Sequence, residues 1–470
     1  MPPERDGRDV DRPKRVAVDH KERARVEDDL GTTFLLEASA GTGKTSVLVN
    51  RYVNCVFAAR DVRRVAAISF TEKAAGELRQ RIREELEQRV ATPKDPQGTT
   101  AIQTALDALD ALDDAPIGTI HGFAARLLRE FPVEARVDPA FEQLDALGSE
   151  IERGRLWDEW LTGLAGGEAD EADDGGADVR EAGARRDDSS QSDVGQADAR
   201  RWLARLLRAG VKLDDVRGLA AGPRGVFGER YDIDPVGRPT NAPDLAADLP
   251  ELTEPLRRLR DFCVKACLNP DDNGYVAAVK LVDACTELLD ESFGVRDLDQ
   301  LAAALFDLST KTNKTAPGGA KANWDATRGG KEELQVRYQA LVAAIAAPRE
   351  RYAAYLTGLA VAVADSFSRW AGAEQLKEGR LDFTDLLGRL RDLLRDNRDA
   401  RRALQARFDY LLVDEFQDTD PLQSEIVFFL SEREPLAVDW HEAVLKPGKL
   451  FVVGDPKQSI YRFRRADIAL

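Results

Sequence analysis

The sequence predicts an α/β fold in which a parallel sheet is interrupted by a large, mainly helical insertion. Strand, loop and helix units follow one another in the first part of the chain, and short apolar runs typical of buried strands return at 408–413 and 450–453. The segment 140–378 between them reads as helices rich in Leu, Ala and Arg. Alternation of strands and helices favours a parallel sheet, and the long helical segment favours a domain inserted into it.

The three opening units have the patterns expected of buried strands followed by helices. The apolar run 33–38 precedes a Gly-containing turn and a helical pattern from Lys44 to about Phe57. The run 65–70 precedes a helical pattern over 72–89, and a third unit starts at Pro116 and enters a helix near His121. The second helix is expected to bury one apolar face, formed by Ala75, Leu78, Ile82 and Leu86.

This pattern divides the chain into four parts. Residues 1–17 are charged and contain Pro, so we expect a disordered tail. Residues 18–139 and 379–470 would form the two parts of one α/β domain, and 140–378 the inserted helical domain. Within the insertion, residues 165–199 are rich in Gly, Ala, Asp and Ser and are expected to be disordered.

The charge balance is strongly acidic, with 84 Asp and Glu against 67 Lys and Arg, a net charge of −17 and a pI near 4.9. This excludes a generally basic nucleic-acid coat, so contact with nucleic acid would depend on local groups. Arg greatly outnumbers Lys, and no Lys occurs between Lys94 and Lys212. An acidic, Lys-poor surface suits a salt-rich cytoplasm, and we expect a halophilic protein.

Cysteine usage and hydropathy predict a cytoplasmic protein with no membrane segment. The chain has four Cys, no signal-peptide pattern at its N-terminus, and no apolar run near the roughly 20 residues that span a bilayer. Cys263 and Cys267 are one helical turn apart and Cys285 follows, which leaves two interpretations, a metal or iron–sulfur site and small buried thiols. The second is favoured because a tetrahedral site needs four ligands and no His lies near.

Residues 38–45 match a phosphate-binding loop except that Ala38 stands where the pattern has Gly. Gly41 and Gly43 let backbone N–H groups wrap phosphates, Lys44 reaches the outer phosphates, and Thr45 binds Mg²⁺. The alternative is a Gly-containing turn without a ligand, which the preceding strand and the following helix disfavour. The predicted nucleotide-binding residues are Ala38, Ser39, Ala40, Gly41, Thr42, Gly43, Lys44 and Thr45.

Two carboxylates, Asp414 and Glu415, follow the strand predicted at 408–413. Ligands of open α/β sheets bind at this end of the strands. Asp414 would hold Mg²⁺, and Glu415 would orient and deprotonate the attacking water, as phosphoryl transfer requires. A plain helix N-cap is the alternative, but the loop at Lys44 favours an ATP and Mg²⁺ site with Lys44 and Glu415 as catalytic residues.

Four segments, in order along the chain, resemble successive motifs of the UvrD-like superfamily 1 DNA helicases. They are 70–75, 119–123, 413–419 and 453–464. The Thr-Ile-His-Gly-Phe form of the second, the segment 381–387 and the large insertion resemble the RecB/AddA branch in particular. The resemblance implies a RecA-like P-loop NTPase domain with an inserted helical domain, followed in complete members by a second RecA-like domain.

The resemblance also implies roles for individual residues. Gln458 would act in catalysis by sensing the γ-phosphate, and an aromatic group would stack on single-stranded bases, comprising Phe70, Tyr461 and Phe463. A second group would contact the strand and its phosphates, comprising Thr71, His121 and Arg464. The implied partners are single-stranded DNA, junctions of single- and double-stranded DNA, and a nuclease or second helicase subunit.

Each of these side chains also has a purely structural interpretation. Phe70 at a strand end and Phe123 on a helix belong more often to a hydrophobic core than to a base platform. His121 at a helix start can cap that helix, as can Asp382 together with Asp385. Their joint order along the chain is what favours the DNA interpretation.

Two departures from the family pattern bear on function. Residues 19–23 offer no Gln at the distance where the family reads adenine, and the sequence ends at Leu470, so the second RecA-like domain is expected to be absent. We expect the isolated chain to bind ATP, hydrolyse it poorly and not unwind DNA alone. The predicted function is an ATP-dependent 3′–5′ DNA helicase of repair and recombination. The alternative is a nucleotide-dependent DNA-binding module or a helicase–nuclease subunit without independent unwinding activity.

Overall fold

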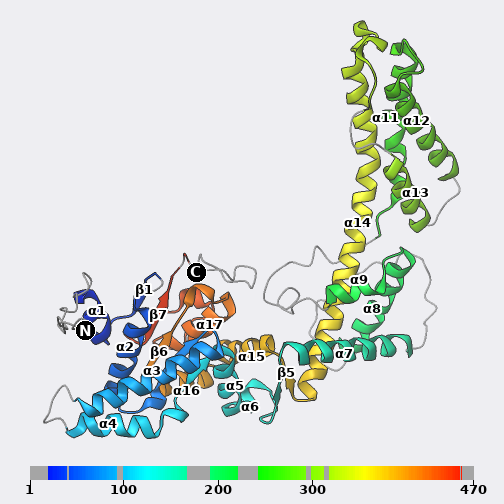
Figure 1. The fold of residues 1–470 in the computed structure, drawn as a ribbon. Helices are drawn as coiled ribbons and strands as arrows, with labels where there is room; N and C mark the ends of the chain where they lie inside the picture. The colour runs from blue at the N-terminus through cyan, green and yellow to red at the C-terminus, as the bar shows by residue number, and fades with distance from the viewer. Residues whose placement is uncertain are drawn as a thin grey trace, which may run out of the picture. The chain divides into compact units, whose positions relative to one another are not determined.

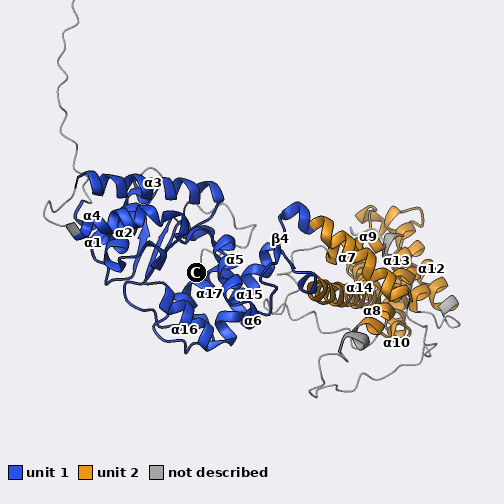
Figure 2. Cartoon of the chain, turned by 90° about the horizontal axis from the view of Figure 1, so that it is seen from below, with its two compact units in different colours: residues 1–149, 375–470 blue, residues 150–374 orange. Residues whose placement is uncertain are grey.

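The computed structural model describes residues 20–39, 42–92, 99–166, 191–220, 242–292, 298–311, 317–455 and 457. The chain forms two compact units, residues 1–149 with 375–470 and residues 150–374 (Figure 2). The first unit contains a parallel sheet with helices on both faces, and the second is built from helices (Figure 1). The predicted fold class is therefore confirmed.

The sheet of the first unit has five parallel strands in the order β1-β7-β6-β2-β3. Strands from before and after the insertion alternate in this order, so the sheet forms only when both parts of the chain come together. The strands are β1 (Phe34–Glu37), β2 (Val65–Ser69), β3 (Ile117–Thr119), β6 (Tyr410–Val413) and β7 (Leu450–Gly454). Because all five are parallel, their carboxyl ends lie at one edge of the sheet.

Successive residues of each central strand enter opposite hydrophobic cores, as the two-residue period of a strand requires. In β6, Leu411 and Val413 face one core and Leu412 faces the other. On the Leu412 face lie α1 (His20–Asp28), α2 (Lys44–Ala59), α3 (Glu72–Ala91) and α4 (Thr99–Asp110). The α3 residues predicted to be buried, Ala75, Leu78, Ile82 and Leu86, are all buried there.

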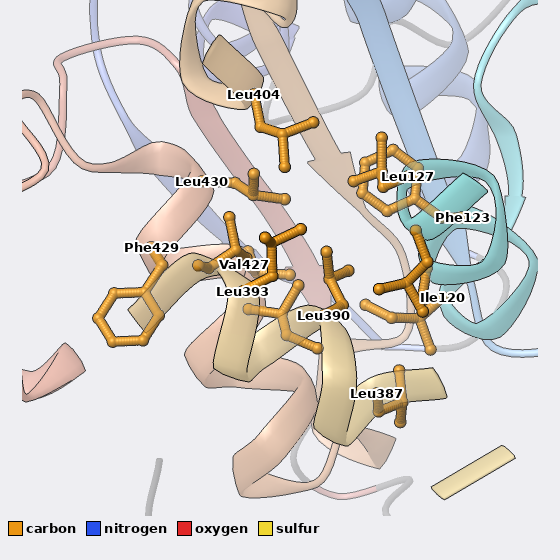
Figure 3. Close-up of a cluster of buried hydrophobic side chains, with 14 of the residues drawn as sticks. Ile120, Phe123, Leu127, Leu387, Leu390, Leu393, Leu404, Val427, Phe429 and Leu430 are labelled. Carbon is orange, nitrogen blue, oxygen red and sulfur yellow. The ribbon is translucent and has the colours of Figure 1, made fainter. Parts of the chain in front are cut away.

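Five helices cover the other face of the sheet. They are α5 (Ile120–Glu130), α6 (Pro132–Ala135), α15 (Phe383–Asp396), α16 (Arg398–Arg407) and α17 (Pro421–Ser431). Figure 3 shows their side chains meeting in this core, with Phe123 of α5, Leu390 of α15 and Phe429 of α17 among them. Two of these helices precede the insertion and three follow it, so this core also joins the two parts of the chain.

A second, two-stranded sheet changes the predicted limits of the insertion. β4 (Glu142–Gln143) pairs in parallel with β5 (Arg380–Leu381). The prediction gave 140–378 to the inserted domain, whereas the second compact unit comprises 150–374. The pairing of β4 with β5 explains the difference, because it holds both connecting segments within the first unit.

The helical unit contains two hydrophobic cores of its own. One includes Trp157, Trp160 and Phe367, and the other includes Phe262 and Trp324. Its helices include α7 (Ala146–Gly166), α8 (Gln191–Arg208), α9 (Leu213–Ala220), α10 (Leu245–Asp248), α11 (Pro250–Ala266), α12 (Asn273–Ser292), α13 (Leu298–Lys311) and α14 (Gly330–Lys377). None of the helices in the described part of the chain combines the length and apolar character that crossing a bilayer requires.

The disordered insert predicted at 165–199 is wrong at both ends. Residues 165–166 complete α7, and α8 begins at Gln191. The prediction weighed average composition, whereas Ala199 and Leu203 on one face of α8 are buried in the core of the helical unit. The remaining residues, 167–190, lie outside the described residues, as does the predicted tail 1–17.

The cysteines of the insertion are packing residues. Cys263 and Cys285 are buried in a core of the helical unit, and burial raises the pKa of each thiol to about 12. The Cys267 thiol donates to the carbonyl oxygen of Asn269 over 3.1 Å. Among the described residues no group of three or more His, Cys, Asp or Glu side chains is placed to hold a metal ion.

Candidate functional site

Three neighbouring strands, β1, β7 and β6, bring the predicted nucleotide-binding residues together. The loop 38–43 follows β1, Asp455 follows β7, and Asp414 follows β6. The backbone N–H of Ala38 donates to the carbonyl oxygen of Gly454 over 3.3 Å, which joins the start of the loop to the end of β7. The loop and the two carboxylates therefore share one edge of one sheet.

The described part of the loop is held in a tight turn before α2. The hydroxyl of Thr42 donates to the carbonyl oxygen of Ser39 over 2.6 Å. Gly43, the residue before α2, has φ +89°, a left-handed conformation that a side chain makes unfavourable. Lys44 is consequently the first residue of α2, as the prediction has it. Ala40 and Gly41 lie outside the described residues.

The Lys44 ammonium is buried at the base of this loop. Its side chain is 10% exposed, and Nζ lies 3.7 Å from Oε2 of Glu415 without a hydrogen-bond partner among the described residues. Buried ammonium groups require acceptors for their three N–H donors. A phosphate group supplies such acceptors, so the environment of Lys44 fits the phosphates of a nucleotide.

Asp414 sits in an environment that disfavours its negative charge. Burial raises the pKa of its carboxyl to about 6, the neighbouring Glu415 raises it further, and the Glu415 N–H and Lys44 partly offset the rise. A divalent cation would favour the ionised form of this carboxylate. Thr45, in the first turn of α2, supplies a hydroxyl near the same sheet edge. Magnesium binds through one or two protein oxygens plus phosphates and water, so these residues fit Mg²⁺.

The backbone of Glu415 is left-handed, with φ +55°. This conformation is uncommon for a residue with a side chain and occurs mainly where surrounding structure enforces it. Glu415 precedes the 3₁₀ turn Phe416–Asp418, but its side chain makes no capping hydrogen bond. A helix cap therefore does not explain Glu415, and its carboxylate faces Lys44 instead.

Two residues of this site were not found by sequence reasoning. The amide of Gln417 bridges the Glu415 carboxylate and the backbone of Asp455. The guanidinium of Arg23 on α1 donates to the carbonyl oxygen of Thr42 over 2.6 Å. Arg23 lies in the segment where an adenine-reading Gln was sought, so the only signal for it was its position. Gln417 lies inside a recognised motif, but its spacing gave no indication of its partners.

The other end of the same sheet edge carries the predicted DNA-binding residues of β2 and β3. Phe70 follows β2 and is half-buried, and Thr71 is exposed and accepts a hydrogen bond from the backbone of Ala74 at the start of α3. Thr119 accepts from the backbone of Gly122 at the start of α5 and donates to Glu72 over 2.7 Å. The two helix starts are thus joined by side chains.

His121 lies in the first turn of α5, next to this pair of helix starts. Its ring contacts Phe383 edge-on, with the ring centroids 4.9 Å apart. Burial lowers the pKa of His121, while Glu72 and Asp382 partly offset that shift. A neutral imidazole is therefore favoured, which can both donate and accept hydrogen bonds.

The structural interpretations weighed for these side chains have mixed outcomes. Thr119 provides the N-cap of α5, so His121 is not its cap. Asp382 and Asp385 do form a capping box at the start of α15, and Phe123 is a core residue. The predicted residues that lie outside the described part are Gln458, Tyr461, Phe463 and Arg464.

Comparison with known proteins agrees with this arrangement. The model of the family described as UvrD/REP helicase N-terminal domain matches residues 18–188 and 279–470. The chain belongs to this family. The matched ranges contain every strand of the main sheet and both carboxylates after β6, so family membership and the geometry of the sheet edge concern the same residues.

Curated relatives place this helicase domain near one kind of protein. The chain is 27% identical to the A subunit of the ATP-dependent helicase/nuclease of Latilactobacillus sakei, over 96% of this chain and 50% of the relative. It is 29% identical to the corresponding protein of Levilactobacillus brevis and 28% identical to that of Lactobacillus delbrueckii, covering 34% and 36% of those proteins. The chain therefore spans half or less of the length of these relatives.

Proposed function

We propose that this chain is the ATP-binding motor domain of an ATP-dependent 3′–5′ DNA helicase that acts in DNA repair and recombination. The observation that carries the proposal is the buried Lys44 ammonium, without a hydrogen-bond partner among the described residues and 3.7 Å from Glu415 at the end of a neighbouring strand. Membership of the helicase family supports an ATP-driven activity. The cytoplasmic location predicted from the sequence remains part of this proposal.

The residues around Lys44 would each have a defined task. The loop from Ala38 to Gly43 and Lys44 would hold the phosphates of ATP, and Thr45 with Asp414 would hold Mg²⁺, which supplies neutralising charge on the phosphates. Glu415 would orient the attacking water and accept its proton. Gln458, which follows β7 by four residues, would sense the γ-phosphate.

The other half of the sheet edge would bind single-stranded DNA. Phe70 would stack on a base, and Thr71 and His121 would contact the strand, together with residues after β7, namely Tyr461, Phe463 and Arg464. The printed description of the relatives, which names a helicase/nuclease of several subunits, supports single-stranded DNA and its junctions with duplex as substrates. It also supports a partner that is a nuclease or second helicase subunit.

One observation favours a second candidate, a nucleotide-dependent DNA-binding module without independent unwinding. The chain spans only 50% of one relative and about a third of others, so what those proteins do is not assigned to these 470 residues alone. In this case ATP binding would change affinity for DNA, and turnover would depend on a partner. Stimulation of ATP hydrolysis by single-stranded DNA separates the two candidates.

The test measures ATP hydrolysis and binding for the whole chain with and without a single-stranded oligonucleotide. Strong stimulation by the oligonucleotide supports the motor, and binding of both ligands without turnover supports the module. Glu415→Gln should keep MgATP binding and lower hydrolysis by about 10²- to 10⁴-fold, because it removes the proton acceptor and keeps the shape. Normal turnover by this variant would contradict the role assigned to Glu415.

A further inference from the structure

Gln417 connects the ends of two neighbouring strands through its side-chain amide. Its Nε2 donates to Oε2 of Glu415 over 2.7 Å, and its Oε1 accepts from the backbone N–H of Asp455 over 2.8 Å. The residue is only 9% exposed. A longer contact of 3.4 Å joins Nε2 to the carboxylate of Asp418. The amide thus reaches from the residue after β6 to the residue after β7.

The partners of this amide fix its orientation. A backbone N–H can only donate, so the atom that faces Asp455 must be the carbonyl oxygen of the Gln417 side chain. The NH₂ group is then the part that faces Glu415. Gln417 therefore presents a donor to the Glu415 carboxylate at all times.

This donor restrains one particular oxygen of Glu415. Oε2 of Glu415 lies between Nε2 of Gln417 at 2.7 Å and Nζ of Lys44 at 3.7 Å. Among the described residues, none hydrogen-bonds the other oxygen, Oε1. The carboxylate is consequently held by one oxygen and leaves the second available to accept a proton.

The close approach of Gln417 to Gly454 gives an independent way to move the amide. A Cβ placed on Gly454 would lie 2.8 Å from Oε1 of Gln417. Because that oxygen is at the far end of a flexible side chain, the amide would shift rather than the strand. Gly454 at the end of β7 thus provides the space in which the amide sits.

We propose that Gln417 is a positioning residue for ATP hydrolysis. It holds Oε2 of Glu415 and ties that carboxylate to the backbone of Asp455, so that Oε1 faces the attacking water. Gln417 does not touch the nucleotide in this role, and its effect passes through Glu415. The inference rests on the proposed function, because it assigns a task to Gln417 only if Glu415 activates water.

The experiment compares kcat and KM for ATP in the whole chain with two substitutions of Gln417. Gln417→Leu removes the amide, and Gln417→Glu keeps the acceptor for Asp455 but places a carboxylate oxygen against Glu415. Both should lower kcat by about 10- to 100-fold with KM for ATP little changed, because the carboxylate is misplaced while the phosphate contacts remain. Gly454→Ala should lower kcat in the same direction.

A matched control comes from Gln405 on α16, which is also 9% exposed and donates through Nε2 to the carbonyl oxygen of Phe429 over 2.8 Å. Gln405→Leu removes a comparable buried amide away from the site and should leave kcat unchanged. In a Glu415→Gln background, Gln417→Leu should cause no further loss, because residues that act as a unit are not additive.

Three results would overturn the positioning role. They are unchanged kcat in both Gln417 variants, an equal loss of kcat in Gln405→Leu, and an additive loss in the Glu415→Gln background. Lys44→Ala identifies a different failure. If wild-type turnover is no higher than that of Lys44→Ala, the proposed function fails and the role of Gln417 fails with it, whereas the other results reject the role of Gln417 alone.

Discussion

The two halves of the sheet edge differ in how their polar groups are satisfied. At the ends of β1, β7 and β6, the Lys44 ammonium is buried without a hydrogen-bond partner in the described part of the chain, and Asp414 is buried beside a second carboxylate. At the ends of β2 and β3, Thr71 and Thr119 accept hydrogen bonds from the starts of α3 and α5. One half is thus electrostatically incomplete, and the other is complete.

This difference indicates what each half is suited to bind. Buried charges without full compensation destabilise a protein and are retained mainly where a ligand completes them. Satisfied side chains that remain accessible, such as Thr71 and the half-buried Phe70, can contact a ligand without prior rearrangement. The first half fits a compact, highly charged nucleotide, and the second fits a long strand that binds through many weak contacts.

The largest expected effect is the loss of ATP binding in Lys44→Ala. Removing the ammonium takes away the only cation within salt-bridge distance of Glu415 among the described residues and leaves the phosphates without a buried positive charge. Losing one partner of a buried charge pair costs roughly 2 to 5 kcal/mol, enough to abolish measurable binding at micromolar ATP. Isothermal titration with a nonhydrolysable ATP analogue checks this.

An exposed lysine of the helical unit provides the control for this change. Lys265 on α11 is 64% exposed and lies 3.8 Å from the carboxylate of Asp261 on the same helix. Lys265→Ala removes the same charge without touching the sheet edge, so ATP affinity should stay at the wild-type value. Equal ATP affinity of wild type and Lys44→Ala would mean that the electrostatic incompleteness of the nucleotide half does not serve a phosphate.

The next effect concerns the stability of the nucleotide-free protein. The pKa of Asp414 is raised from 3.8 to about 6, chiefly by burial. A raised folded-state pKa gives a contribution to stability that is present below pH 3.8 and is lost as pH rises through about 6. Asp414→Asn resembles the protonated form, so it should increase the free energy of unfolding at pH 7.5 by about 1 to 3 kcal/mol.

Urea unfolding of Asp414→Asn and wild type at pH 7.5 and pH 4 measures this contribution. The stabilisation by Asn should shrink at pH 4, where the wild-type carboxyl is protonated in the folded state. The same variant should lose the stabilisation that ATP with Mg²⁺ gives to wild type, because a neutral amide replaces the anionic ligand. A destabilised Asp414→Asn protein at pH 7.5 would show that the carboxylate is well compensated without a cation.

Local patterns in the sequence were sufficient to predict the elements of this edge. The buried face of α3, the start of α2 at Lys44 and the strand before Asp414 all follow from hydrophobic period and Gly placement over a few neighbouring residues. These features depend on short-range geometry. They could therefore be identified without knowing which strands are neighbours.

What could not be predicted depends on contacts between distant segments. The position of β7 between β1 and β6 is set by packing of both parts of the chain, and it is this order that brings Gln417 next to Asp455. The contact of Arg23 with Thr42 joins a helix to a loop that lies 19 residues along the chain. The limits of the insertion likewise follow from pairing of β4 with β5, whose strands are too short to show a sequence period.

The smallest expected effect tests the DNA half of the edge. Phe70→Ala should weaken binding of a single-stranded oligonucleotide by about 1 to 3 kcal/mol if the ring stacks on a base, with ATP affinity unchanged. Phe306→Ala is the control, because Phe306 is 59% exposed on α13 of the helical unit. Fluorescence anisotropy gives the affinities, and urea unfolding shows whether Phe70 is needed for the fold. Unchanged DNA affinity together with a large loss of stability would place Phe70 in the core and remove the clearest aromatic contact from the DNA half.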